Sequence, residues 1–210
     1  MAWTCGSTTE LSIGLVHAAV VGAALLPLAA LGVGAATQGL GADPIEHITH
    51  VTGEWALRLL LASLAITPLR RFGALRGLAP YRRSLGLLGF TYATLHLLTY
   101  VGLDQGFAWP LLAEDVLERR YITAGLGAWL CLLPLAITST RASIKRLGRR
   151  WVALHRLAYP AGVLAVIHYV WLVKADLLAP LLHASLLALL LGARIAARRR
   201  TAVASGSGGP

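Results

Sequence analysis

Charged residues are scarce in this sequence, and acidic residues are the scarcest of them. Only 13% of the 210 residues are charged, with 9 Asp and Glu against 19 Lys and Arg, and the mean hydropathy is +0.68. This composition lies outside the range of soluble domains, so we expect the bilayer to be the solvent. The net charge of +10 does not indicate nucleic-acid binding, because the basic residues form short blocks between long apolar runs.

Cysteine is nearly absent, and no segment is typical of a nucleotide-binding domain. Cys5 and Cys131 lie far apart in the sequence, which predicts neither a disulfide framework nor a metal motif. No predicted strand leads into a Gly-rich phosphate loop, and we interpret residues 39–44 as an outer turn. No internal repeat is evident. Redox chemistry in this chain would therefore need electrons from a separate protein or from a membrane carrier such as quinol.

The sequence does contain apolar runs that are long enough to cross a bilayer, which takes roughly 20 residues at about 1.5 Å each. Six runs qualify: 11–36, 51–69, 84–103, 121–140, 151–173 and 176–196. We therefore predict an all-α integral membrane protein, a six-transmembrane-helix bundle over residues 11–196. Residues 1–10 form the predicted cytoplasmic N-terminus, and residues 197–210 form a predicted disordered cytoplasmic tail.

The basic residues alternate between the connections of these six helices and predict the orientation of the bundle. Three on the expected outer side are Arg119, Arg120 and Lys174. Those on the expected inner side are Arg70, Arg71, Arg76, Arg82, Arg83, Arg141, Lys145, Arg146, Arg149, Arg150, Arg194 and Arg198 to Arg200. By the positive-inside rule, both termini are cytoplasmic.

Histidines within the predicted spans are the candidate functional residues, because ionisable groups are costly in a membrane. Four lie at membrane depth, namely His96, His155, His168 and His183, whereas His17 lies near the start of the first helix and His47 and His50 fall in the outer loop. One such histidine often only hydrogen-bonds to a neighbouring helix. Several together indicate haem, since a low-spin haem takes two axial imidazoles from facing helices.

The depth of each histidine predicts which two share a haem. His96 is 13 residues beyond Arg83, and His168 is 18 beyond Arg150, a difference in depth of roughly 8 Å. His155 is only five residues beyond Arg150, roughly 12 Å from the depth of His96. We therefore expect His96 and His168 to hold a haem in the outer half. His155 would either bind a second haem or alternate as a partner of His96.

Helical phase leaves the number of haems open. On an ideal helix His155 and His168 lie roughly 140° apart, although Pro160 between them can kink the helix or shift its phase.

Two further residues have both a cofactor-binding and a simpler interpretation. Gly89, seven residues before His96, is expected on the same face and either leaves room for a porphyrin or lets helices approach closely. Arg58 either pairs with Glu54, four residues before it, or with haem propionates. Arg82, Arg83 or Arg156 would serve an inner haem in the same way, although Arg156 is better explained by snorkelling to the interface.

Several short motifs together resemble a known family. They are Thr52-Gly53, Thr67-Pro-Leu-Arg-Arg71, Arg82-Arg-Ser-Leu-Gly86, Leu95-His96, Arg120-Tyr-Ile-Thr123, Leu154-His-Arg-Leu-Ala-Tyr159 and His168-Tyr-Val-Trp171. Residues 40–196 resemble the MsrQ family, the haem-binding membrane subunits of bacterial periplasmic methionine-sulfoxide reductase systems, in the ferric-reductase-like transmembrane superfamily. His96, His155 and His168 match the characteristic histidines of this family, whereas His17 and His183 match none of its motifs and are interpreted as packing residues.

The resemblance implies a b-type haem electron-transfer subunit in the bacterial inner membrane. Electrons would come from the quinone pool or a cytoplasmic flavin reductase and pass to a periplasmic molybdopterin methionine-sulfoxide reductase, which performs the sulfoxide chemistry. Haem b and FMN are the implied cofactors. Two alternatives remain: a stand-alone transmembrane ferric reductase, which the absence of a dehydrogenase domain disfavours, and a non-redox transporter whose histidines relay protons.

Overall fold

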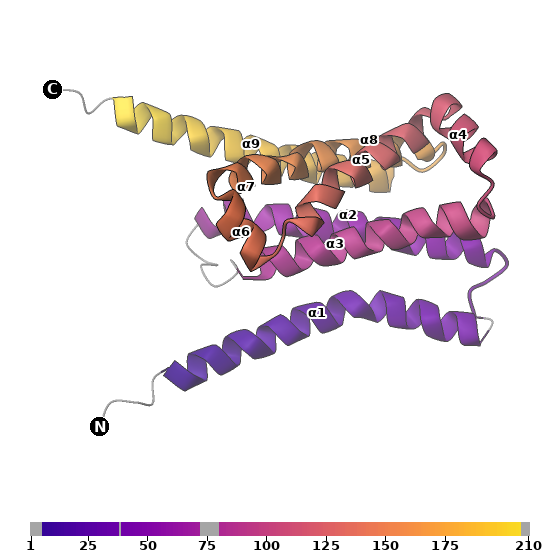
Figure 1. Ribbon diagram of the computed structural model, residues 1–210, viewed down its shortest axis with the longest axis horizontal. Coiled ribbons are helices and arrows are strands. Elements are labelled where there is room, and N and C mark those ends of the chain that lie inside the picture. Colours follow the sequence, from indigo (N-terminus) through magenta and orange to yellow (C-terminus); the bar gives the residue numbers. More distant parts are fainter. Residues whose placement is uncertain (1–5, 38, 72–79, 207–210) are drawn as a thin grey trace.

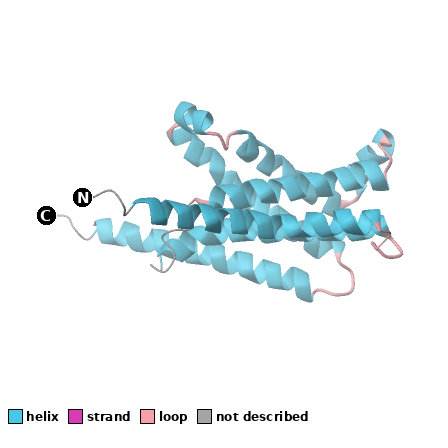
Figure 2. Ribbon diagram, turned by 90° about the horizontal axis from the view of Figure 1, so that it is seen from below, coloured by secondary structure: helices cyan, strands magenta, loops and turns pink. Residues whose placement is uncertain are grey.

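All of the regular secondary structure is helical in the residues that the computed structural model describes, which are 6–37, 39–71 and 80–206. Figures 1 and 2 show a bundle of helices joined by turns, with no strand in these residues. The elements are α1 (Gly6–Ala36), α2 (Pro44–Arg71), α3 (Tyr81–Leu98), the π-helix η2 (Thr99–Asp104), α4 (Trp109–Glu118), α5 (Arg120–Ile137), α6 (Arg141–Leu147), α7 (Arg149–Leu154), the 3-10 helix η3 (His155–Leu157), α8 (Ala158–Leu172) and α9 (Leu178–Gly206).

Four of these helices are long and apolar enough to cross a membrane. They are His17–Ala36 in α1, Tyr81–Asp104 in α3 and η2, Arg120–Ile137 in α5, and Leu178–Ala197 in α9. The second and fifth predicted spans fall on α2 and on the segment from α7 to α8. The ion pair Glu54–Arg58 lowers the hydropathy of α2, and α8 has only 15 residues.

Local sequence explains where two of these helices begin or are interrupted. Asp43 accepts a hydrogen bond from the Glu46 amide at 2.9 Å and, with Pro44 after it, starts α2. Pro160 has no amide proton to donate four residues back, and the chain before it forms the 3-10 turn η3 between α7 and α8. The predicted irregularity between His155 and His168 is therefore present.

Leucines of α2 form the centre of the bundle. Leu57, Leu60, Leu61 and Leu64 pack in one cluster with Leu132 and Leu135 of α5, Val166 of α8 and Leu187 of α9. Their spacing of three and four residues places them on one face of α2, which explains why this helix contacts both α8 and α9.

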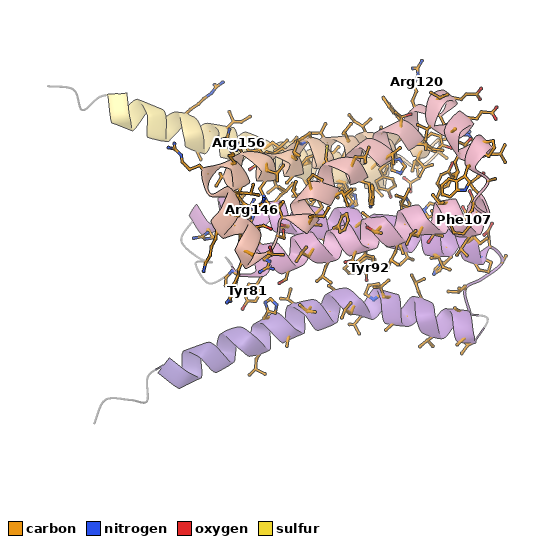
Figure 3. All side chains as sticks on the ribbon, in the orientation of Figure 1. Tyr81, Tyr92, Phe107, Arg120, Arg146 and Arg156 are labelled. Carbon is orange, nitrogen blue, oxygen red and sulfur yellow. The ribbon has the colours of Figure 1, made fainter. Side chains whose placement is uncertain are left out.

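α1 lies beside α3 at the edge of the bundle (Figure 1). Tyr92, labelled in Figure 3, is fully buried and donates its hydroxyl to the Ala24 carbonyl at 2.6 Å. His17 stacks on Tyr81 and lies 3.2 Å from the Ser84 hydroxyl through Nε2, which agrees with its interpretation as a packing residue.

The first residues of α1 and the last of α9 lie at the same end of the bundle as α6 and α7, and α4 lies at the opposite end (Figure 1). Arg146 and Arg156 lie at the first of these ends, and Phe107 and Arg120 at the other (Figure 3). α9 continues to Gly206, whereas the sequence predicts a disordered tail from residue 197. Alanine and arginine favour the helix, and residues 197–205 contain no Gly or Pro that would interrupt it.

Candidate functional site

His96 on α3 lies against α2, where it makes a hydrogen bond and where a glycine leaves room for its ring. Its Nδ1 lies 2.9 Å from the Thr49 carbonyl oxygen. One turn further along α2, a Cβ placed on Gly53 would lie 2.9 Å from the same Nδ1, so only glycine leaves room for the ring. Because a carbonyl accepts but does not donate, Nδ1 carries the proton and Nε2 keeps a free lone pair.

His168 on α8 is held against α5 in the same way. Its Nδ1 donates to the Tyr121 carbonyl oxygen at 2.6 Å, and a Cβ on Gly125 would lie 2.8 Å from Nδ1. Histidines that bind a metal commonly donate their other ring nitrogen to such a carbonyl, which fixes the tautomer and the orientation of the ring. Both imidazoles therefore keep Nε2 available to bind a metal ion.

The contacts of the two histidines repeat with one spacing. In each case 47 residues separate the histidine from the carbonyl that it contacts, and the facing glycine comes four residues after that carbonyl. The helix pairs α2–α3 and α5–α8 are thus repeats of one arrangement. No internal repeat is evident in the sequence, because the two pairs share few residues beyond this glycine and histidine.

The structure brings together the two histidines that the sequence predicts as a pair. The ring centroids of His96 and His168 are 6.0 Å apart, and the ring planes are inclined by 80°. This separation is smaller than the predicted difference in depth of roughly 8 Å, because counting residues from the basic blocks treats the segment from α7 to α8 as one straight helix, whereas η3 interrupts it.

His155 lies apart from this pair, in η3 next to α7. Its ring stacks on Trp151 with centroids 3.7 Å apart, and its Nδ1 lies 3.1 Å from the Trp151 carbonyl. Its Nε2 is buried and has no hydrogen-bond partner among the described residues. A buried polar nitrogen without a partner is costly and is typical of a position that a ligand completes.

Gly89 and Arg58 fit their simpler interpretations. Gly89 shares the α2-facing side of α3 with His96, as predicted, but a Cβ there would lie 3.3 Å from the Leu60 amide nitrogen. It therefore allows close packing of α3 on α2, and room for a cofactor at Gly89 stays a prediction. Arg58 pairs with Glu54 and lies over the Trp55 ring, 5.3 Å from its centroid. A contact between Arg58 and haem propionates stays a prediction.

Sequence reasoning missed four residues of this site. Gly53 and Gly125 leave room for the rings, and the backbone carbonyls of Thr49 and Tyr121 orient them. The usable signal was the equal separation of each glycine from the histidine that follows it on the next helix of its pair. His183, interpreted as a packing residue, donates Nδ1 to the Ala179 carbonyl of its own helix and contacts the Tyr169 ring.

Comparison with known proteins gives one family and a set of close relatives. Residues 52–166 match the family described as the ferric reductase like transmembrane component. The haem-binding subunit MsrQ of protein-methionine-sulfoxide reductase from Xanthomonas axonopodis pv. citri is 50% identical over 198 residues, which are 90% of this chain and 89% of that protein. The protein of the same name from Rhodospirillum rubrum is 50% identical over 200 residues, which are 94% and 96% of the two chains. No solved structure matches.

Proposed function

Because this chain belongs to the MsrQ family of haem-binding subunits, within the ferric-reductase-like transmembrane proteins, we propose that it binds haem b through His96 and His168 and transfers electrons across the bilayer. The observation that carries the proposal is the pairing of these two imidazoles with both Nδ1 atoms engaged by carbonyls. Two imidazoles that held one metal ion between their Nε2 atoms would have centroids about 6 Å apart, since each metal–nitrogen bond is about 2 Å long and each nitrogen lies about 1 Å from its ring centroid. The residues therefore fit the group.

A haem with two histidine ligands supplies a one-electron carrier that has no open position for a substrate. The chain's own contribution is to orient both rings and to keep them within the helices. His155 marks a second position, closer to α6 and α7, where its free Nε2 suits a second haem with one histidine from this chain. The separation of His155 from the pair disfavours its alternation with His168 as a ligand.

The proposed topology has six spans with both termini in the cytoplasm. α2 and α8 lie alongside α3 and α5 in Figure 1, and these neighbours are themselves long and apolar enough to cross. α2 measures about 42 Å at 1.5 Å per residue, which exceeds the hydrocarbon thickness. The basic residues at the end with α6 and α7 make that end cytoplasmic, in a bacterial inner membrane.

The name of the relatives supports a methionine-sulfoxide reductase as the proposed partner. They are described as subunits of a protein-methionine-sulfoxide reductase, so the proposed acceptor is a periplasmic enzyme, with molybdopterin, that reduces methionine sulfoxide in oxidised proteins. The proposed donor is quinol or a cytoplasmic flavin reductase, and FMN is the proposed second cofactor. The absence of a nucleotide-binding motif from the sequence is consistent with an external donor.

The test is haem quantification by pyridine haemochromogen, with optical spectra, on purified wild type, His96→Ala and His168→Ala. His183→Ala is the matched control, because it removes a membrane histidine outside the pair. We expect the first two variants to lose the low-spin haem and the control to keep it. Equal haem in all four proteins would refute the proposal. Flavin fluorescence of an acid extract tests FMN, and rapid reduction of ferric chelates by the isolated protein would favour the stand-alone ferric reductase.

A further inference from the structure

Two glycines face the rings of His96 and His168 at a distance that excludes any side chain. A Cβ on Gly53 would lie 2.9 Å from Nδ1 and 3.0 Å from Cε1 of His96. On Gly125, a Cβ would lie 2.8 Å from Nδ1 and 3.0 Å from Cε1 of His168. These separations are well inside van der Waals contact, which lies near 3.5 to 4 Å. Even an alanine methyl group would therefore displace the ring.

Neither ring is free to move away from its glycine, because Nδ1 of each ring is hydrogen-bonded to a backbone carbonyl. The Thr49 carbonyl holds Nδ1 of His96 at 2.9 Å, and the Tyr121 carbonyl holds Nδ1 of His168 at 2.6 Å. These carbonyls come from the same helices as the glycines, one turn earlier. A methyl group on the glycine thus requires either a broken hydrogen bond or a rotated ring.

The same arrangement fixes the angle between the two rings. One glycine and one carbonyl on each facing helix restrict the orientation of both rings. The two ring planes are inclined by 80°. We propose that Gly53 and Gly125 are positioning residues that hold the two axial imidazoles in nearly perpendicular planes. This inference rests on the proposed function, since it concerns ligands of the proposed haem.

Perpendicular imidazoles have a spectroscopic consequence. When the planes are parallel, both imidazoles interact with the same iron dπ orbital, which separates the dπ energies and gives a rhombic ferric EPR spectrum. When the planes are perpendicular, each imidazole interacts with a different dπ orbital, so the energies are nearly equal and the spectrum is strongly axial with a large gmax. The 80° angle predicts the second kind of spectrum for the wild type.

The experiment uses the full-length protein in detergent and compares haem titrations and ferric EPR spectra of wild type, Gly53→Ala and Gly125→Ala. Gly127→Ala is the matched control on α5, since its Cβ would lie 3.4 Å from Leu164 Cδ1. Gly86→Ala, with a Cβ 3.4 Å from the Ser63 hydroxyl oxygen, is the control on α3. We expect the first two variants to bind haem about 10- to 100-fold more weakly, as with other disturbed metal-orienting contacts, and to lose the large-gmax signal. Both controls should keep affinity and signal.

The outcomes separate this inference from the proposed function. If His96→Ala loses the haem while Gly53→Ala and Gly125→Ala behave as the wild type, the positioning role is wrong and haem binding by His96 stands. Equal loss in Gly127→Ala and Gly125→Ala would also overturn it, because the effect would then be helix packing. A rhombic wild-type spectrum would overturn it whether or not the variants fold. Haem retained in His96→Ala would instead contradict the proposed function.

Discussion

The helix pairs α2–α3 and α5–α8 are alike at one level of the bundle and different at another. At the level of His96 and His168, each pair offers a histidine, a facing glycine and an accepting carbonyl at the same spacing. Thirteen residues before His168 the second pair has His155, whereas thirteen before His96 the first pair has Arg83. α3 is continuous there, but the chain before α8 is interrupted by η3.

This difference means that, in the proposed function, the two levels would bind haem differently. The outer level has two equivalent imidazoles that face each other, which suits a haem with two histidine ligands. At the level of His155, these two helix pairs have one imidazole, because α3 has Arg83 where α8 is preceded by a histidine. A guanidinium is always charged and does not bind iron, so any inner haem would differ from the outer one in its second ligand.

The largest expected effect is on haem binding, and it distinguishes the level of His155 from the level of His96 and His168. His155→Ala should leave the low-spin signal of the outer haem intact and remove only haem bound in addition to it, because His155 does not contact the His96–His168 pair. Redox difference spectra, set against those of His96→Ala, measure this. Loss of the outer signal in His155→Ala would show that the levels are not independent.

A large effect on stability is expected where the two pairs join. Leu61 of α2 is 2% exposed and packs in the cluster shared with α5, α8 and α9, so Leu61→Ala should lower the free energy of unfolding by about 2–5 kcal/mol. Leu69→Ala, at a 40% exposed position of the same helix, should change it by less than about 0.5 kcal/mol. Unfolding by SDS titration measures both values. Similar values for the two variants would argue against a shared core.

A smaller effect is expected from the hydrogen bond that links the pairs directly. Trp129 on α5 donates Nε1–H to the Thr94 hydroxyl on α3 at 3.1 Å, and its ring stacks on Phe90. A double-mutant cycle with Trp129→Phe and Thr94→Val should give a coupling energy of about 0.6 kcal/mol, the average for such bonds in membranes. Coupling near zero would mean that the pairs are held together by apolar packing alone.

The smallest effect is expected at the ion pair that only the first helix pair has. Glu54 and Arg58 are 35% and 45% exposed, so Arg58→Gln should cost about 0.2–1 kcal/mol and leave the haem content unchanged. Glu54→Gln is the matched control, and haem quantification is the measurement. Loss of haem in Arg58→Gln but not in Glu54→Gln would restore Arg58 as a partner of the propionates.

The sequence by itself determined the class of protein, the family and the pair of histidines. Hydropathy and the placement of Lys and Arg are properties of segments, so the apolar helices and the basic end could be predicted without any tertiary contact. His96 and His168 stood out because a membrane rarely tolerates unexplained imidazoles.

Only the tertiary structure decided how these histidines are held. The carbonyls of Thr49 and Tyr121 carry no sequence signature, since every residue has one, and the equal spacing of Gly53 and Gly125 from their histidines gains a meaning only once the rings are seen to face them. Gly89 and Gly53 look equivalent in a sequence, yet one packs against a backbone and the other against an imidazole. The sequence predicted an irregularity at Pro160 but not its effect on helical phase, because a 3-10 turn changes the rotation per residue in a way that residue counting does not capture.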